Sequence, residues 1–274
     1  MPERQALSLR LAEASVLGAE NKDLPRFSIL RITGSLASPS AVSFAWDSEL
    51  GNLVLRQQGV ENGLTEYLSD GQRSSAMNGQ GALEKRSAWG ELVSYVPVGF
   101  DHIIPKGLDH ILFVLGLFFL TLRVSALLWQ ISAFTLAHTV TLAAGAMGWV
   151  TISGNVVEPL IAASIVFVAV ENIFSQKLHR WRPALIFGFG LLHGLGFASV
   201  LQEFGLPDGQ FIAALIGFNI GVEIGQLTVI ACAFLLLGVW FGNKPWYRAY
   251  ISIPSSCLIA LIGAYWVIER TILA

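Results

Sequence analysis

The sequence predicts an all-α polytopic membrane helix bundle of about six transmembrane helices, preceded by a small β-rich extracytoplasmic region. Of the 274 residues, 54% are hydrophobic and only 13% are charged, whereas typical soluble domains carry about 25% charged residues. Residues 1–90 are polar and mixed, but the rest of the chain is a series of apolar runs. These runs have about the 20-residue length that a helix needs to span the hydrocarbon core.

We divide the chain into three parts. Residues 1–73 are predicted to form the β-rich extracytoplasmic region, because Leu7, Leu9 and Leu11 alternate, as do Val42, Phe44 and Trp46. Its size is small for a whole domain. Residues 74–100 are predicted to hold a linker, SSAMNGQG, and then an interfacial amphipathic helix over 87–96 that Pro97 stops. Residues 101–270 form the predicted six-helix transmembrane domain.

The loops between the apolar runs predict the orientation of this domain. The six spans are expected at about 104–122, 128–149, 156–175, 184–203, 211–241 and 249–268. Basic residues occupy the first, third and fifth connections, namely Arg123, Lys177, Arg180, Arg182, Lys244 and Arg248. Because Lys and Arg favour the cytoplasmic side, we expect residues 1–100 and the extreme C-terminus to lie outside the cytoplasm. The stretch MPERQALSLR has no apolar leader core. We therefore expect that a leader precedes it or, as the less favoured alternative, that the first helix carries the N-terminal region across the membrane.

Ionisable residues inside the apolar runs are the main functional signal. The predicted metal ligands are His110, Asp109, His138, His193 and Glu223. A bilayer core penalises such groups by several kcal/mol, so they mark candidate sites. At a rise of 1.5 Å per residue, His138 and His193 lie at similar levels, roughly 15 Å from the inner ends of their helices. The carboxylates approach the same level from the outer side, and one bundle can therefore gather these groups.

The chemistry of this set predicts a divalent transition-metal ion, nickel or cobalt first and zinc as an alternative. Neutral imidazoles suit these metals, and carboxylates supply compensating charge. Further candidates for the metal site or its pathway are His102, Glu158, Asn219 and Gln226. Several candidates have a structural alternative. An intramembrane His such as His138 can simply bond a neighbouring helix, Glu158 at a helix start can satisfy free N–H groups, and His102 at the outer membrane edge can be solvated. Glu171 and Asn172 are expected to reach the cytoplasmic interface, outside the site.

Other classes of site find little support. No dense basic cluster indicates a nucleic-acid partner, and no Gly-x-x-x-x-Gly-Lys sequence indicates direct use of ATP. Cys232 and Cys257 lie in apolar runs and are expected to be packed thiols. The expected partners are thus a metal ion and the lipid bilayer, with the oligomeric state open.

Glycines at a spacing of four residues predict close helix packing. The residues concerned are Gly190 and Gly194 in the fourth run and Gly217, Gly221 and Gly225 in the fifth. In the fifth run this glycine stripe lies roughly opposite Asn219 and Glu223. One face is therefore expected to pack a neighbour while the other presents polar groups.

Five stretches resemble the HupE/UreJ family of bacterial membrane proteins, in its branch with an extracytoplasmic N-terminal extension. They are HIIPKGLDHILFVLGLFFL, AFTLAHTVTLAAGAMGW, VEPLIAASIVFVAVEN, FGFGLLHGLGFAS and GFNIGVEIGQL, and they cover about residues 100–230. The family's His-Pro-x-x-Gly-x-Asp-His signature maps onto His102, Gly107, Asp109 and His110. Here Ile103 replaces the proline, and one extra residue separates His102 from Asp109. The resemblance implies a polytopic fold and a role as a secondary nickel or cobalt permease.

Three functions follow as hypotheses. The first is a permease that carries the divalent ion across the membrane through the His/Asp/Glu site. The second is an intramembrane zinc-like hydrolase, in which three His and a carboxylate activate water and Ser164 or Ser199 assists. The third is a membrane sensor or assembly partner whose outer β region binds something else.

Overall fold

A computed structural model describes residues 9–17, 27–34, 41–51, 53–57, 59–60, 63–68, 71–83, 87–175, 178–204 and 210–273. Leu7 and the side chain of Ser199 lie outside this description. The chain divides into two units, 1–85 and 86–274. The fold class is confirmed, because short antiparallel sheets occupy the first unit and helices the second.

The N-terminal unit contains three two-stranded antiparallel sheets. They are β1 (Leu9–Leu17) with β2 (Phe27–Gly34), β3 (Leu53–Arg56) with β4 (Thr65–Leu68), and β5 (Met77–Asn78) with β6 (Gly81–Ala82). The alternation at Val42–Trp46 yields only isolated bridges, Val42 to Met77 and Ala45 to Arg73. The segment expected to be a linker instead contains the β5–β6 hairpin, and its turn at 79–80 is the Gly-containing pair between the two strands.

The second unit is helical. Its elements are α1 (Ala88–Ile103), α2 (Leu108–Leu120), α3 (Val124–Ala146), α4 (Gly154–Phe174), α5 (Arg182–Phe204), α6 (Phe211–Ala233), α7 (Val239–Phe241) and α8 (Ile253–Ile268), with π-helical turns η2 (Phe234–Gly238), η3 (Arg248–Ser252) and η4 (Glu269–Leu273). By length and composition, four helices of the described chain can cross a membrane, and the pair α1–α2, bent by 75°, would make a fifth. Helix α5 coincides with the predicted run at 184–203.

The first predicted span differs from the structure. Helix α2 has only 13 residues, or roughly 20 Å at 1.5 Å per residue, and the hydrocarbon core is about 30 Å thick. Helix α1 runs for 16 residues straight through Pro97, where the sequence predicted a stop. Proline removes one donor and its ring crowds the carbonyl four residues earlier. The packing of α1 against α6 compensates for this cost, so the helix continues.

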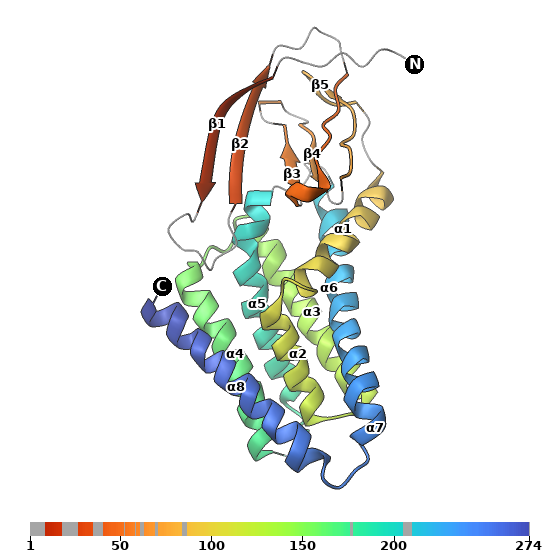
Figure 1. Cartoon of the computed structure of the whole chain (residues 1–274), viewed down its shortest axis with the longest axis vertical. Coiled ribbons are helices and arrows are strands. Elements are labelled where there is room, and N and C mark those ends of the chain that lie inside the picture. The colour runs from red at the N-terminus through yellow and green to blue at the C-terminus, as the bar shows by residue number, and fades with distance from the viewer. Residues whose placement is uncertain are drawn as a thin grey trace. The chain divides into compact units, whose positions relative to one another are not determined.

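The helices pack in the pairs α1–α6, α3–α5 and α4–α8, and α2 lies among them (Figure 1). The glycine stripe of α6 makes the first pair close. A Cβ added at Gly217 would overlap the carbonyl oxygen of Leu92, and one at Gly221 would overlap that of Val96. Gly225 faces Ile103 in the same way. Small residues thus let the two backbones touch, as the spacing predicted.

A second glycine pair brings α5 against α3. A Cβ at Gly190 would lie 2.5 Å from the carbonyl oxygen of Phe134, and one at Gly194 would overlap the carbonyl oxygen of His138. The His-bearing turns of α3 and α5 therefore lie in direct backbone contact. This contact sets the position of His193 relative to α3.

The helical unit exposes large apolar side chains and buries several polar ones within its apolar core, which suits a lipid environment. Large apolar side chains face outward, for example Leu136 on α3 and Leu258 and Leu261 on α8, which are 60–68% exposed. The buried set includes many polar side chains. Exposed Trp89 and Trp149 lie near one end of the helices and Trp129, Trp181 and Trp240 near the other, as in the aromatic belts of membrane proteins. Taken together, these features describe a multi-pass membrane protein.

Candidate metal centre

Four histidines from four helices gather inside the bundle. His102 lies on α1, His110 on α2, His138 on α3 and His193 on α5. Candidate ligand nitrogens of the first three all lie within 4.8 Å of one another. The His193 ring is centred 5.0 Å from that of His110. We call these four residues the histidine group.

The bend between α1 and α2 brings His102 to His110. Pro105 and Gly107 interrupt the helix between them, and the two rings are centred 4.9 Å apart. A Cβ at Gly107 would overlap the backbone carbonyl oxygen of His102, so the chain can turn this tightly only with glycine there. The spacing of this segment differs from that of the family signature. The bend nevertheless places His102 in the histidine group.

The protonation of two of the rings follows from their neighbours. The Nδ1 atom of His138 lies 3.2 Å from the Oδ1 atom of Asn219. The same amide donates to the carbonyl of Leu215, which orients its oxygen toward the ring. Nδ1 of His193 lies 2.9 Å from the carbonyl oxygen of Phe189. Since both partners only accept, each Nδ1 carries the proton and each Nε2 presents a lone pair.

The Nε2 atoms of the histidine group have no hydrogen-bond partner in the described part of the chain. Nε2 of all four histidines is buried and unpaired among the described residues. The side chains are also deeply placed, since His110, His138 and His193 are at most 6% exposed, and His102 is half-buried. Unpaired buried polar atoms are uncommon in proteins and point to an ion or other ligand. The donor set, four imidazoles from four helices, is one that nickel, cobalt, zinc and copper(II) accept.

Phenylalanine rings enclose the group. Phe134 is centred 5.0 Å from His193 and 5.8 Å from His110, and Phe197 is centred 4.1 Å from His102. Such walls exclude water and hold the rings apart from other donors. A dication bound at the histidine group would be balanced by neutral ligands only. This apolar environment favours release of the ion.

The predicted carboxylate ligands lie elsewhere. Asp109 forms a two-pronged ion pair with Arg270 of η4, at 3.1 and 3.2 Å. Arg270 also contacts the backbone carbonyl of Glu158, whose own side chain is exposed. Glu223 accepts a hydrogen bond of 2.7 Å from Ser132. Among the described residues, the group of close candidate ligands consists of histidines alone. On a helix, consecutive residues point about 100° apart, which is why Asp109 turns away from the group that His110 joins.

The two predicted amides lie along α6 toward the interior. Asn219 bonds His138, as described. The amide oxygen of Gln226 accepts from the hydroxyl of Thr135 at 3.2 Å, and its Nε2 is buried without a partner in the described chain. The glycine stripe and the polar stripe of α6 thus occupy different faces, one against α1 and one against α3.

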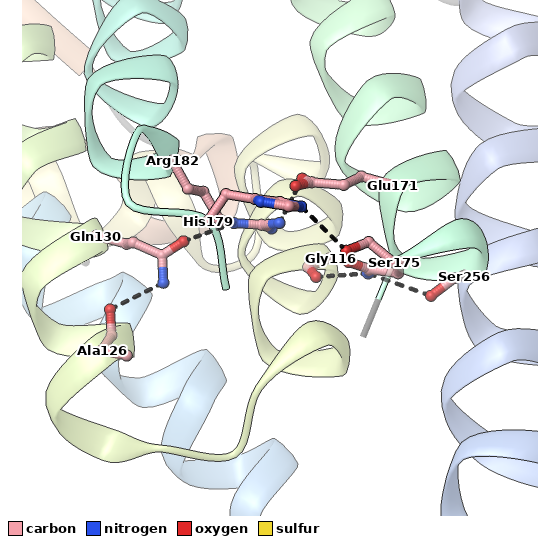
Figure 2. Close-up of polar contacts among 9 residues, drawn as sticks. Gly116, Ala126, Gln130, Glu171, Ser175, His179, Arg182 and Ser256 are labelled. Atoms are coloured by element: carbon pink, nitrogen blue, oxygen red, sulfur yellow. Dashed lines mark hydrogen bonds and ion pairs between the residues drawn. The ribbon is translucent and has the colours of Figure 1, made fainter. Parts of the chain in front are cut away.

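A second polar centre was not predicted. Arg182, Glu171 and Gln130 lie near the end of the bundle that carries the basic connections (Figure 2). The side chain of Arg182 is 0% exposed and forms an ion pair with Glu171, which is 10% exposed. The interpretation of Glu171 and Asn172 as interfacial is wrong, because Asn172 is fully buried and donates to the carbonyl of Gly116. The sequence did contain a signal for this centre. It is an acidic residue inside one apolar run, followed by a basic residue at the start of the next run.

The hydrolase hypothesis relied on a serine near the metal. The hydroxyl of Ser164 donates to the carbonyl of Ile161 at 2.6 Å, in its own helix. The Ser199 side chain is outside the described part. The described hydrogen bond of Ser164 therefore ties this hydroxyl to its own helix.

Comparisons with known proteins were made for the whole chain. The family model described as "HupE / UreJ protein" matches residues 78–270. Searches among curated proteins and among solved structures found no match. The family match covers most of the chain, including every helix that carries the histidine group. The chain therefore belongs to the HupE/UreJ family.

Proposed function

We propose that this protein is an integral membrane permease for a divalent transition-metal ion, nickel or cobalt, which passes through the histidine group. The observation that carries this proposal is the convergence of four imidazoles from four helices, three of them buried and that of His102 half-buried. Each has an Nε2 atom without a partner among the described residues. The family assignment supports it, since the family is associated with transport of nickel and cobalt.

The chemistry of the histidine group suits an ion that passes through the site better than an ion that stays bound there. A permeation site must bind its ion well enough to admit it and weakly enough to release it. Neutral imidazoles satisfy the borderline preference of nickel and cobalt but leave the two positive charges of the ion uncompensated. A closed thiolate cage would hold such ions far more tightly. The transported ion is the substrate here, and no metal need remain bound between cycles.

The same proposal includes the orientation. The connections rich in Lys and Arg lie at one end of the helices (Figure 1), and this end is proposed to face the cytoplasm of a bacterial inner membrane. The N-terminal unit is then extracytoplasmic. The histidine group lies toward the outer half of α2, because His110 is in its first turn.

Uptake of radioactive nickel and cobalt into cells tests the proposal. Cells that express the protein should accumulate the ion faster than cells with the doubly substituted His138→Ala and His193→Ala protein. His179→Ala is the matched control, because His179 is exposed in a basic loop, where it stacks on Trp181 and lies 3.5 Å from the hydroxyl of Ser175. Equal uptake by the double variant, at equal amounts in the membrane, would exclude transport through this group.

A further inference from the structure

The second polar centre of the bundle is a buried ion pair with a fixed geometry. We call Arg182, Glu171 and Gln130 the arginine centre. Nε of Arg182 donates to Oε1 of Gln130 at 2.8 Å, while the amide nitrogen of Gln130 donates to the carbonyl of Ala126 at 2.9 Å. The amide is thus oriented from behind, and Arg182 Nη1 bonds Glu171 (Figure 2). Three helices, α3, α4 and α5, contribute one side chain each.

This pair is incompletely satisfied. Oε1 of Glu171 and Nη2 of Arg182 are buried and have no partner among the described residues. A buried ion pair adds little stability compared with apolar side chains of the same volume. Ionisable side chains inside a membrane protein generally mark pathways or switches. Both features indicate that the pair is retained for a function.

Buried polar side chains lie at intermediate levels between the arginine centre and the histidine group along α3. Gln130 precedes His138 by eight positions, roughly 12 Å at 1.5 Å per residue. Between these levels, Thr135 bonds Gln226 of α6, and the Nε2 of Gln226 is again unpaired in the described chain. Thr135, Gln226 and Gln130 are each at most 5% exposed. The polar groups therefore occur at three successive levels of the interior.

We propose that the Glu171 carboxylate is a second cation site of this pathway, and that Arg182 occupies it until the cation arrives. The inference rests on the proposed permease function and extends it. A cation that leaves four neutral imidazoles needs an anionic ligand at the other end, and Glu171 is the carboxylate in the arginine centre. Guanidinium and metal ion compete for the same carboxylate, of which Arg182 bonds Oε2 while Oε1 has no partner among the described residues. Arg182 therefore keeps the cation from resting there and limits its dwell time.

The number of bound ions tests the exchange. Purified protein is equilibrated with nickel or cobalt chloride and the bound metal is measured by elemental analysis. The wild type should bind one ion per chain at the histidine group. Arg182→Gln should bind two, because the carboxylate has lost its competitor. Arg182→Gln with Glu171→Gln should return to one. Arg180→Gln, which removes an exposed cation two positions away, should bind one.

The outcomes separate the two proposals. A folded Arg182→Gln protein that binds no more metal than the wild type overturns the second site but leaves the histidine group intact. A wild type that binds no metal contradicts the permease proposal itself.

If the Arg182→Gln protein does not fold, a second variant tests the proposed cation site. Glu171→Gln keeps the bulk and hydrogen-bonding capacity of the side chain but leaves the Arg182 charge uncompensated in the pathway. Its metal affinity at the histidine group should equal that of the wild type, while its nickel or cobalt uptake should fall at least tenfold. Uptake at the wild-type rate would overturn the role of Glu171.

Discussion

The Oδ1 atom of Asn219 lies 3.2 Å from the Nδ1 atom of His138, and this contact determines which nitrogen of the imidazole can bind a metal. The Asn219 amide is itself oriented by the carbonyl of Leu215. Outer contacts of this kind hold a ligand in one tautomer and one ring orientation. The carbonyl of Phe189 holds the His193 ring in one tautomer and one orientation in the same way.

Replacing Asn219 should weaken metal binding without removing a ligand. Asn219→Ala is expected to lower the affinity for nickel or cobalt about 10- to 100-fold, the usual effect of losing such a partner. Asn219→Asp keeps an acceptor for the Nδ1 proton but loses the donor to the Leu215 carbonyl, so its affinity should lie between those of the alanine variant and the wild type. Competition with a coloured chelator measures both. An alanine variant with wild-type affinity would show that the contact does not control the ring.

Asp109 and His110 are neighbours in sequence but should differ in their effect on binding. Asp109 is paired with Arg270 at the partly exposed edge of the bundle, and exposed ion pairs contribute about 0–1 kcal/mol. Asp109→Asn should therefore change the affinity by less than about fivefold. His110→Ala removes a ligand and should cost more than the roughly 10- to 100-fold typical of an outer partner. Isothermal titration with nickel distinguishes the two, and equal losses would make Asp109 a ligand.

Glu223 should be dispensable for metal binding. Its carboxylate accepts a hydrogen bond from the hydroxyl of Ser132, an exposed residue of α3. Glu223→Gln preserves this contact by size and hydrogen bonding, so the number of bound ions should stay at the wild-type value. Elemental analysis of the loaded protein checks it. Loss of the ion would place Glu223 in the site, as the sequence predicted.

The glycines of α6 should be far less tolerant of a methyl group than Gly188 of α5. A Cβ at Gly221 overlaps the backbone of α1, whereas one at Gly188 meets nothing within 4 Å. Gly221→Ala should destabilise the protein by about 1–3 kcal/mol, the usual cost of overpacking. Gly188→Ala should be neutral or gain up to about 1 kcal/mol from helix propensity. Thermal unfolding in detergent compares them, and an unchanged Gly221→Ala protein would contradict the close packing.

The sequence predicted the membrane bundle and three of the four histidines of the group because both depend on local signals. Apolar run length identifies the helices, and an imidazole inside such a run is conspicuous wherever it lies. His102 was weaker because it lies at the edge of a run. Its place became clear only from the bend at Pro105–Gly107, which depends on the packing of α1 against α6.

The partners of the carboxylates could not be predicted in the same way. The Asp109–Arg270 pair joins residues 161 positions apart, and Arg182 counted as a loop residue in the sequence. Which of two nearby opposite charges a carboxylate meets depends on helix rotation, and rotation is set by packing contacts such as those of Gly190 and Gly194. Hydrophobic periodicity predicts which face of a helix is buried, but not which neighbouring helix packs against that face.

X-ray absorption spectroscopy of the protein loaded with nickel or cobalt tests the central claim most directly. The account predicts a first shell of three or four imidazole nitrogens, with no sulfur ligand, and loss of that imidazole signal in the His110→Ala with His138→Ala protein. A metal coordinated by carboxylates and water alone, unchanged by these substitutions, would contradict it.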